Sequence, residues 1–184
     1  DHAAVETEPF TQWVIEDDFA AGRPAWEAGG ALFVATVAPY EQMKLRLLNG
    51  THSLLAYAGF LAGHETVAEA VRDPGLRAIA ERQMQAAAAT LPPVPGIDLD
   101  GYRAQLVARF ANRAIRHLTY QIAMDGTEKL PQRILAPLAE TLARGGDAAP
   151  FAFAVAAWMR YCLGVGDAGE PYALRDPRER LIAP

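Results

Sequence analysis

Residues 39–63 read PYEQMKLRLLNGTHSLLAYAGFLAG and predict one helix of about six turns. Pro39 suits the first helical turn, Glu41 complements its positive end, and Gly63 stops it. Leucines and other apolar residues occupy several flanks of this helix, which indicates that it is buried. We therefore expect a mainly α-helical protein with this segment in its interior.

Three polar side chains interrupt the apolar residues of this helix. At about 100° per residue, His52 falls about 80° and Asn49 about 140° around the axis from Lys44, so all three can face one pocket. A buried lysine can exchange a proton near neutral pH, which makes Lys44 a candidate acid or base. Glu41 lies one turn earlier and could relay that proton. The alternatives are a solvated lysine, a histidine of the core and a carboxylate that only favours the helix start.

A second polar group surrounds Lys129, which follows Asp125-Gly126 at a predicted turn between helices. Arg116, His117 and Gln121 are expected on the helix before that turn. Together these side chains could form a polar face for a sugar or an acid, although a solvated face is the more common outcome.

The remaining sequence predicts a short β-containing N-terminal segment followed by helices. Short β-branched and aromatic runs at 12–15 and 32–37 are expected to be strands. Capping residues, prolines and glycines predict helices at 65–71, 73–89, 98–110, 112–124, 131–143 and 151–163, with a proline-rich loop at 92–96 and irregular structure after Gly166.

The composition fits one compact domain over residues 1–184. The chain is 51% hydrophobic and 21% charged, with a net charge of −5, so we expect neither a nucleic acid nor an anionic membrane as a partner. Its longest apolar runs are shorter than the roughly 18 to 20 residues that span a bilayer. The histidines form no metal-ligand pair. The single cysteine, Cys162, suits a reducing compartment, and we expect a cytoplasmic location.

The chain begins with Asp1 and looks like part of a longer protein. It contains neither a Gly-x-Gly-x-x-Gly turn nor a phosphate-binding loop with lysine. Any nucleotide cofactor is therefore expected to be held elsewhere.

Five segments together resemble the C-terminal domain of the mannitol dehydrogenase family, the polyol-specific long-chain dehydrogenases and reductases. They lie at 8–17, 22–27, 44–53, 109–112 and 125–129, and they read EPFTQWVIED, GRPAWE, KLRLLNGTHS, RFAN and DGTEK. The resemblance implies a multi-helical domain like the C-terminal domain of 6-phosphogluconate dehydrogenase. It also implies an N-terminal Rossmann domain in the same polypeptide, which binds NAD or NADP, and catalysis without a metal.

The resemblance assigns roles to individual residues. It implies that Lys44 is the general acid or base and that Asn49 and His52 bind the reacting oxygen and orient the substrate. The position of Glu41 is associated with a proton path to solvent in this family. The position of Lys129 contacts substrate hydroxyls.

Residues 115–126 look more like the mannonate oxidoreductase branch, also called fructuronate reductase, than like mannitol 2-dehydrogenase. Gln121 stands where mannitol 2-dehydrogenases tend to have an arginine. The uronate branch usually has an arginine at the position of Leu118, so a carboxylate contact would fall to Arg116 or Lys129. The expected reaction interconverts D-fructuronate and D-mannonate. The alternatives are a mannitol or arabinitol 2-dehydrogenase and a non-catalytic helical binding module.

Overall fold

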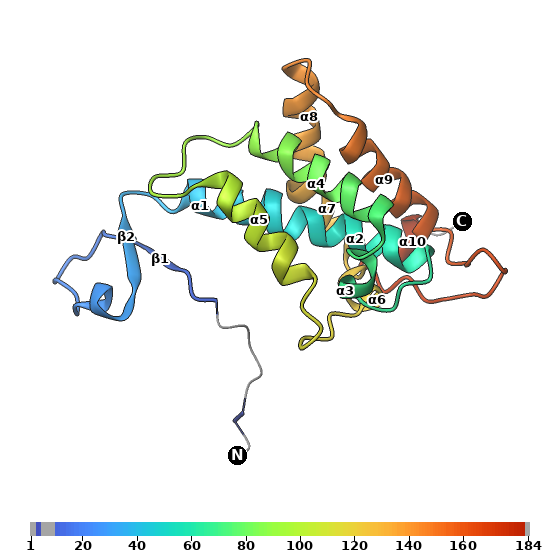
Figure 1. The fold of residues 1–184 in the computed structure, drawn as a ribbon, viewed down its shortest axis with the longest axis horizontal. Coiled ribbons are helices and arrows are strands. Elements are labelled where there is room, and N and C mark those ends of the chain that lie inside the picture. Colours follow the sequence, from blue (N-terminus) through green and yellow to red (C-terminus); the bar gives the residue numbers. More distant parts are fainter. Residues whose placement is uncertain (1–2, 5–9, 183–184) are drawn as a thin grey trace.

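The computed structural model describes residues 3–4 and 10–182, which form a helical body with a small projecting sheet (Figure 1). The predicted strands are confirmed as β1 (Trp13–Glu16) and β2 (Ala31–Val34). They pair in parallel, with Trp13 opposite Ala31. Aromatic rings from both strands and from the connection between them pack together outside the helical body, namely Trp13, Phe19, Trp26 and Phe33.

The predicted central helix is confirmed, and it is continuous from Ala38 to Leu61. It consists of α1 (Ala38–Met43), a first π turn (Lys44–Asn49) and α2 (Gly50–Leu61). The side chains of α2 form much of the core, and those of Leu54, Leu55 and Tyr57 are almost fully buried. The helix α2 packs against α3 (Val67–Ala70), α4 (Pro74–Ala88), α6 (Thr119–Ile122) and α9 (Ala149–Tyr161).

A second long helix crosses the central one. It consists of α7 (Gly126–Leu130), a second π turn (Pro131–Leu135) and α8 (Ala136–Ala143). In each π turn an amide bonds to the carbonyl five residues earlier, as Gly50 does with Leu45. The two π turns lie against each other, and a Cβ atom at Gly50 would come within 2.9 Å of the Arg133 carbonyl oxygen. A glycine therefore permits this close crossing.

The predicted caps at Asp73 and Asp98 are confirmed. The Asp73 carboxylate accepts hydrogen bonds from the amides of Gly75 and Leu76, and Pro74 takes the first position of α4. Asp98 caps α5 (Leu99–Phe110) through the Asp100 amide. These contacts satisfy amides that have no partner inside the helix.

The helix predicted at 112–124 is wrong, because only Thr119–Ile122 is helical within it. The Asn112 side chain accepts a hydrogen bond from the Ala114 amide and closes a local turn instead of starting a helix. Leu118 then forms an antiparallel bridge with Thr66, and the Thr119 hydroxyl donates to the His64 carbonyl. The backbone of 117–119 thus bonds to the segment at 64–67 rather than to itself.

Lys129 was predicted on a turn, but it lies inside α7, which begins five residues before the expected start of that helix. Asp125 adopts a left-handed backbone with φ of 59°, and the helix starts at the next residue. A Cβ atom at Gly126 would lie 2.5 Å from Trp158 Nε1, so this start also requires a glycine. Thr127 is fixed by two hydrogen bonds to Asp176.

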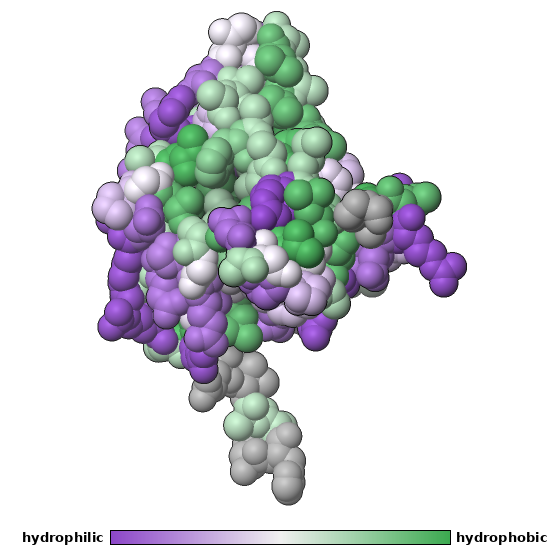
Figure 2. All heavy atoms as spheres, turned by 90° about the vertical axis from the view of Figure 1, so that its right-hand side faces the viewer, coloured by the Kyte–Doolittle hydropathy of each residue, from purple (hydrophilic) through white to green (hydrophobic). Residues whose placement is uncertain are grey.

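The segment beyond Gly166 is largely irregular, as expected, except for the short helix α10 (Glu179–Ile182). Figure 2 shows apolar side chains across the upper part of one face of the body. Several large apolar side chains are exposed in this part of the chain. They are Leu142 in α8, Phe153 and Met159 in α9, and Leu163 just after α9. Within residues 3–4 and 10–182, no helix is long and apolar enough to cross a membrane.

Candidate active site

The first π turn changes how Lys44, Asn49 and His52 are arranged. A π turn joins residues i and i+5, so Asn49 follows Lys44 after about one turn of this helix. His52 lies three residues further along α2 and is a surface neighbour of Asn49. The three side chains therefore occupy successive turns along one flank, closer in angle than a regular α-helix would place them.

Two of these side chains have no partner in the described part of the chain. Neither Lys44 Nζ nor the Asn49 amide group forms a hydrogen bond or ion pair there. Asn49 is half-buried, but Lys44 is exposed, so the predicted burial of this lysine is wrong for this domain. The leucines between these residues take the buried side of the helix, with Leu47 fully enclosed, and leave the ammonium facing outward.

His52 lies deeper than Lys44. Burial, followed by the charges of nearby His117 and Arg133, lowers the pKa of His52 from 6.5 to about 3. Its ring lies 4.8 Å from that of Phe110 and 5.5 Å from that of His117, measured between ring centroids. The His52 Nε2 atom is buried and has no hydrogen-bond partner. A neutral imidazole of this kind offers one donor and one acceptor to a bound molecule.

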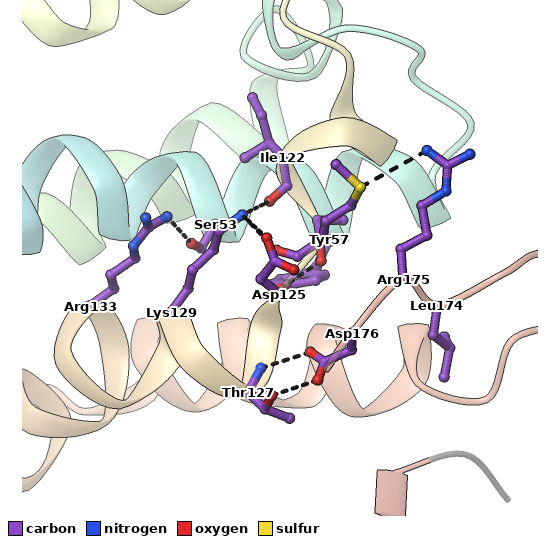
Figure 3. Close-up of polar contacts among 12 residues, drawn as sticks. Ser53, Tyr57, Ile122, Asp125, Thr127, Lys129, Arg133, Leu174, Arg175 and Asp176 are labelled. Atoms are coloured by element: carbon purple, nitrogen blue, oxygen red, sulfur yellow. Dashed lines mark hydrogen bonds and ion pairs between the residues drawn. The ribbon is translucent and has the colours of Figure 1, made fainter. Parts of the chain in front are cut away.

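Lys129 reaches from α7 toward the end of α6 (Figure 3). Its ammonium donates to the Met124 carbonyl at 2.6 Å and to the Ile122 carbonyl at 3.5 Å, and it lies 3.6 Å from an Asp125 carboxylate oxygen. The Tyr57 hydroxyl donates to the Ala123 carbonyl in the same turn. Lys129 therefore already holds the turn that follows Gln121.

Arg133 lies one turn beyond Lys129, and the sequence analysis did not select it. Figure 3 shows both side chains extending from their helix toward α2. The Arg133 guanidinium donates to the Ser53 hydroxyl at 3.5 Å, while its Nε atom is buried without a partner. The sequence did contain one indication of its role: Arg133 is four residues after Lys129, so on a helix the two side chains are neighbours on one face.

The other predicted residues are more dispersed. Arg116 and His117 lie in the irregular segment before α6, so the predicted shared helix with Gln121 is wrong. Arg116 is exposed and paired with Glu65, whereas His117 faces His52. Gln121 is exposed on α6, and Glu41 is exposed on α1. Among the described residues, no cluster of three or more histidine, cysteine, aspartate or glutamate side chains could hold a metal.

Comparison with known proteins decides the family. The model of the mannitol dehydrogenase C-terminal domain matches residues 36–183. The chain belongs to the mannitol dehydrogenase family. This assignment confirms the family resemblance and the multi-helical fold class.

Individual relatives of this family member include enzymes of both expected kinds. D-mannonate oxidoreductase of Escherichia coli is 51% identical over 178 residues, which cover 96% of this chain and 37% of that protein. Mannitol 2-dehydrogenase of Aspergillus fumigatus is 43% identical, over 97% of this chain and 37% of its own length.

A solved structure is also similar. Pseudomonas fluorescens mannitol 2-dehydrogenase, in a ternary complex with NAD and D-mannitol, superposes with a TM-score of 0.88 at 43% identity. The match covers 95% of this chain and 36% of that protein. The chain thus spans a little over a third of the length of the relatives it matches.

Proposed function

We propose that this chain is the substrate-binding and catalytic domain of a metal-independent, NAD(P)-dependent oxidoreductase that interconverts D-fructuronate and D-mannonate. The proposal includes a Rossmann domain in the same polypeptide, N-terminal to these residues, and a cytoplasmic location. It rests mainly on one observation: Lys44, Asn49 and His52 line one flank of the central helix, and each has polar atoms without a partner in the described residues.

These free groups match the needs of carbonyl reduction. Negative charge develops on the substrate oxygen during reduction, and the Asn49 amide and the neutral His52 ring can each donate a hydrogen bond to it. Lys44 Nζ can deliver the proton that completes the alcohol. In the direction of oxidation, Lys44 accepts that proton and passes it toward solvent past Glu41, one turn earlier.

The nicotinamide cofactor would supply or accept the hydride. The free and exposed Lys44 flank fits a substrate that is enclosed only when another part of the polypeptide covers it. We therefore assign NAD or NADP binding chiefly to the proposed Rossmann domain. NAD is bound in the similar Pseudomonas structure.

Substrate positioning falls to residues around the end of α6. Lys129 fixes the carbonyls of this turn, and we propose that substrate hydroxyls meet its ammonium there. His117 adds a second imidazole beside His52, and Gln121 is exposed on α6. Arg116 contributes less in this proposal because Glu65 already neutralises it.

A mannitol or arabinitol 2-dehydrogenase is the alternative, and the similarity to the Pseudomonas mannitol enzyme favours it. The higher identity to D-mannonate oxidoreductase favours the sugar acid. A non-catalytic helical module would also keep this fold, but it has no use for a buried His52 Nε2 atom without a partner. Initial rates of the full-length enzyme with D-fructuronate and with D-fructose separate the two enzymes.

Replacement of Lys44 tests the chemical assignment. In the full-length enzyme we expect Lys44→Ala to lower kcat by roughly 100-fold or more, because a general acid or base is lost. Lys44→Arg should be similarly impaired, since a guanidinium keeps the charge but does not release its proton. The exposure of Lys44 predicts an unchanged melting temperature for both variants.

Arg77→Ala is a suitable control, because Arg77 is an exposed residue of α4 whose side chain pairs with nearby Glu81. It should retain the turnover of the unmodified enzyme. Near-normal kcat in Lys44→Ala across neutral pH would show that Lys44 is not the acid or base.

A further inference from the structure

Arg133 is unusual among the arginines with little exposure. It forms no ion pair with any carboxylate in the described residues, and it is half-buried. Its Nε atom has no partner, and its closest polar contact is a long one to Ser53. Four other buried or half-buried arginines pair with carboxylates, namely Arg23, Arg46, Arg103 and Arg160.

A partly desolvated and unpaired cation is costly for the folded protein. Burial lowers the pKa of Arg133, in agreement with loss of water around its guanidinium. Such a charge is usually neutralised by a carboxylate or by a bound anion. Because no carboxylate of the described chain fulfils that role, a ligand with negative charge is the natural partner.

The surroundings of Arg133 belong to the proposed active site. Its guanidinium contacts Ser53, the residue after His52, and its charge acts on the buried His52 ring. The unpartnered His52 Nε2 lies in this same region. A molecule that occupies this region meets a guanidinium and an imidazole, both of which can donate hydrogen bonds to oxygen acceptors.

The other candidate cations are less available. Arg116 is exposed and already paired with Glu65. The Lys129 ammonium donates to two backbone carbonyls and lies beside Asp125. Leu118 cannot bind an anion. Arg133 combines partial burial, an Nε donor without a partner in the described residues and a position close to His52.

We propose that Arg133 binds the carboxylate of a sugar-acid substrate and thereby gives the site its preference for an acid over a neutral ketose. This inference rests on the proposed oxidoreductase function. A guanidinium binds a carboxylate through two parallel N–H donors, which fixes orientation as well as charge. The Ser53 hydroxyl accepts a hydrogen bond from the guanidinium and links it to α2, one residue from His52.

The test uses steady-state kinetics of the full-length enzyme with NAD(P)H and either D-fructuronate or D-fructose. Arg133→Gln should lower kcat/KM for D-fructuronate roughly 10- to 100-fold, because a hydrogen-bonded charge contact is lost. The loss should lie mainly in KM, with kcat little changed. For D-fructose, kcat/KM should stay within about twofold of the value for the unmodified enzyme, because D-fructose has no carboxylate to contact Arg133.

Two further variants control for folding. Arg133→Lys keeps the charge without the paired donors and should have an intermediate KM for D-fructuronate. If Arg133→Gln fails to fold, the KM of Arg133→Lys for D-fructuronate tests the carboxylate contact instead. Arg77→Gln removes an exposed arginine from α4 and should leave both substrates unaffected.

The outcomes separate this inference from the function on which it rests. Equal losses for both substrates, or a fall in kcat without a rise in KM, would indicate a structural role and overturn the inference. Unchanged kinetics in Arg133→Gln would also overturn it. An unmodified enzyme that reduces D-fructose but not D-fructuronate would remove the carboxylate assignment and leave an oxidoreductase. Failure to reduce either compound would reject the proposed function itself.

Discussion

His52 illustrates how the environment of one residue sets its chemistry. Burial, with cationic neighbours such as Arg133, keeps its ring neutral far below the usual pKa of a histidine. A neutral ring can donate to a carbonyl oxygen without competing with Lys44 for the role of acid. This division of roles follows from depth: the ammonium is exposed, whereas the imidazole lies beside Phe110.

The same burial predicts a pH-dependent stability. The folded pKa of His52 is about 3 and the unfolded value is near 6.5, so the unfolded chain binds more protons between these values. Stability contributed by this site is complete above pH 6.5 and falls as the pH decreases toward 3. Between pH 7 and pH 5, His52 should account for a loss of roughly 2 kcal/mol at most in the free energy of unfolding.

Urea unfolding of the protein and of His52→Gln at both pH values measures this contribution. The variant should lose less stability than the unmodified protein over this interval, because its amide does not titrate. Subtracting the loss of the variant from that of the unmodified protein removes the effect of paired carboxylates that both proteins share. Asp147 is one of them, because a hydrogen bond from Arg82 lowers its pKa. Equal losses in both proteins would show that His52 is not buried in neutral form.

At the scale of helices and strands, local sequence signals predicted most elements. Pro74 after Asp73 and the glycines after helices mark ends that the structure confirms. The helix at 112–124 failed because Leu118 and Thr119 bond to residues 64–66, more than 50 positions earlier. No local pattern reports such a contact.

The candidate site was predicted unevenly for a similar reason. The Lys44 to His52 spacing lies within one helix, so sequence alone could place those residues on one flank. The π turn was not predictable, because a regular α-helix was the default for this pattern. Arg133 was missed because its importance comes from lacking a carboxylate partner, which only the assembled structure reveals.

The crossing of the two π turns yields a prediction for Gly50. Alanine usually favours a helix over glycine by about 1 kcal/mol. Here the added methyl group would lie 2.9 Å from the Arg133 carbonyl oxygen, a backbone atom that cannot rotate away. Gly50→Ala should therefore destabilise the protein by about 1 to 2 kcal/mol, since overpacking exceeds the gain in propensity.

Thermal or urea unfolding checks this change against Gly29→Ala. A Cβ atom at Gly29 would meet no atom within 4 Å, so its replacement should alter stability by less than about 0.5 kcal/mol. A stabilised Gly50→Ala variant would mean that the two helices can separate without cost. Gly50→Ala should also raise KM for D-fructuronate, because displacement of the second π turn moves Arg133.

For the molecule as a whole, the projecting sheet contrasts with the helical body (Figure 1). Two parallel strands form only a marginal sheet by themselves. The aromatic rings beside them remain open, and Trp13 is 55% exposed. The chain also spans about 37% of the length of its mannonate oxidoreductase relative. We therefore expect the sheet to be completed by the proposed N-terminal domain.

Hydrogen exchange measured by mass spectrometry tests this expectation. In the isolated 184-residue chain, amides of β1 and β2 should exchange rapidly, because local opening of a two-stranded sheet costs little. Amides of α2 around Leu54 to Tyr57 should exchange only through global unfolding, since this helix lies in the core. They serve as the internal reference. In the full-length polypeptide, the strands should become at least about tenfold slower, while α2 remains the slowest segment. Equally rapid exchange of β1 and β2 in both proteins would contradict the two-domain arrangement, because a sheet buried at a domain junction cannot open independently of it.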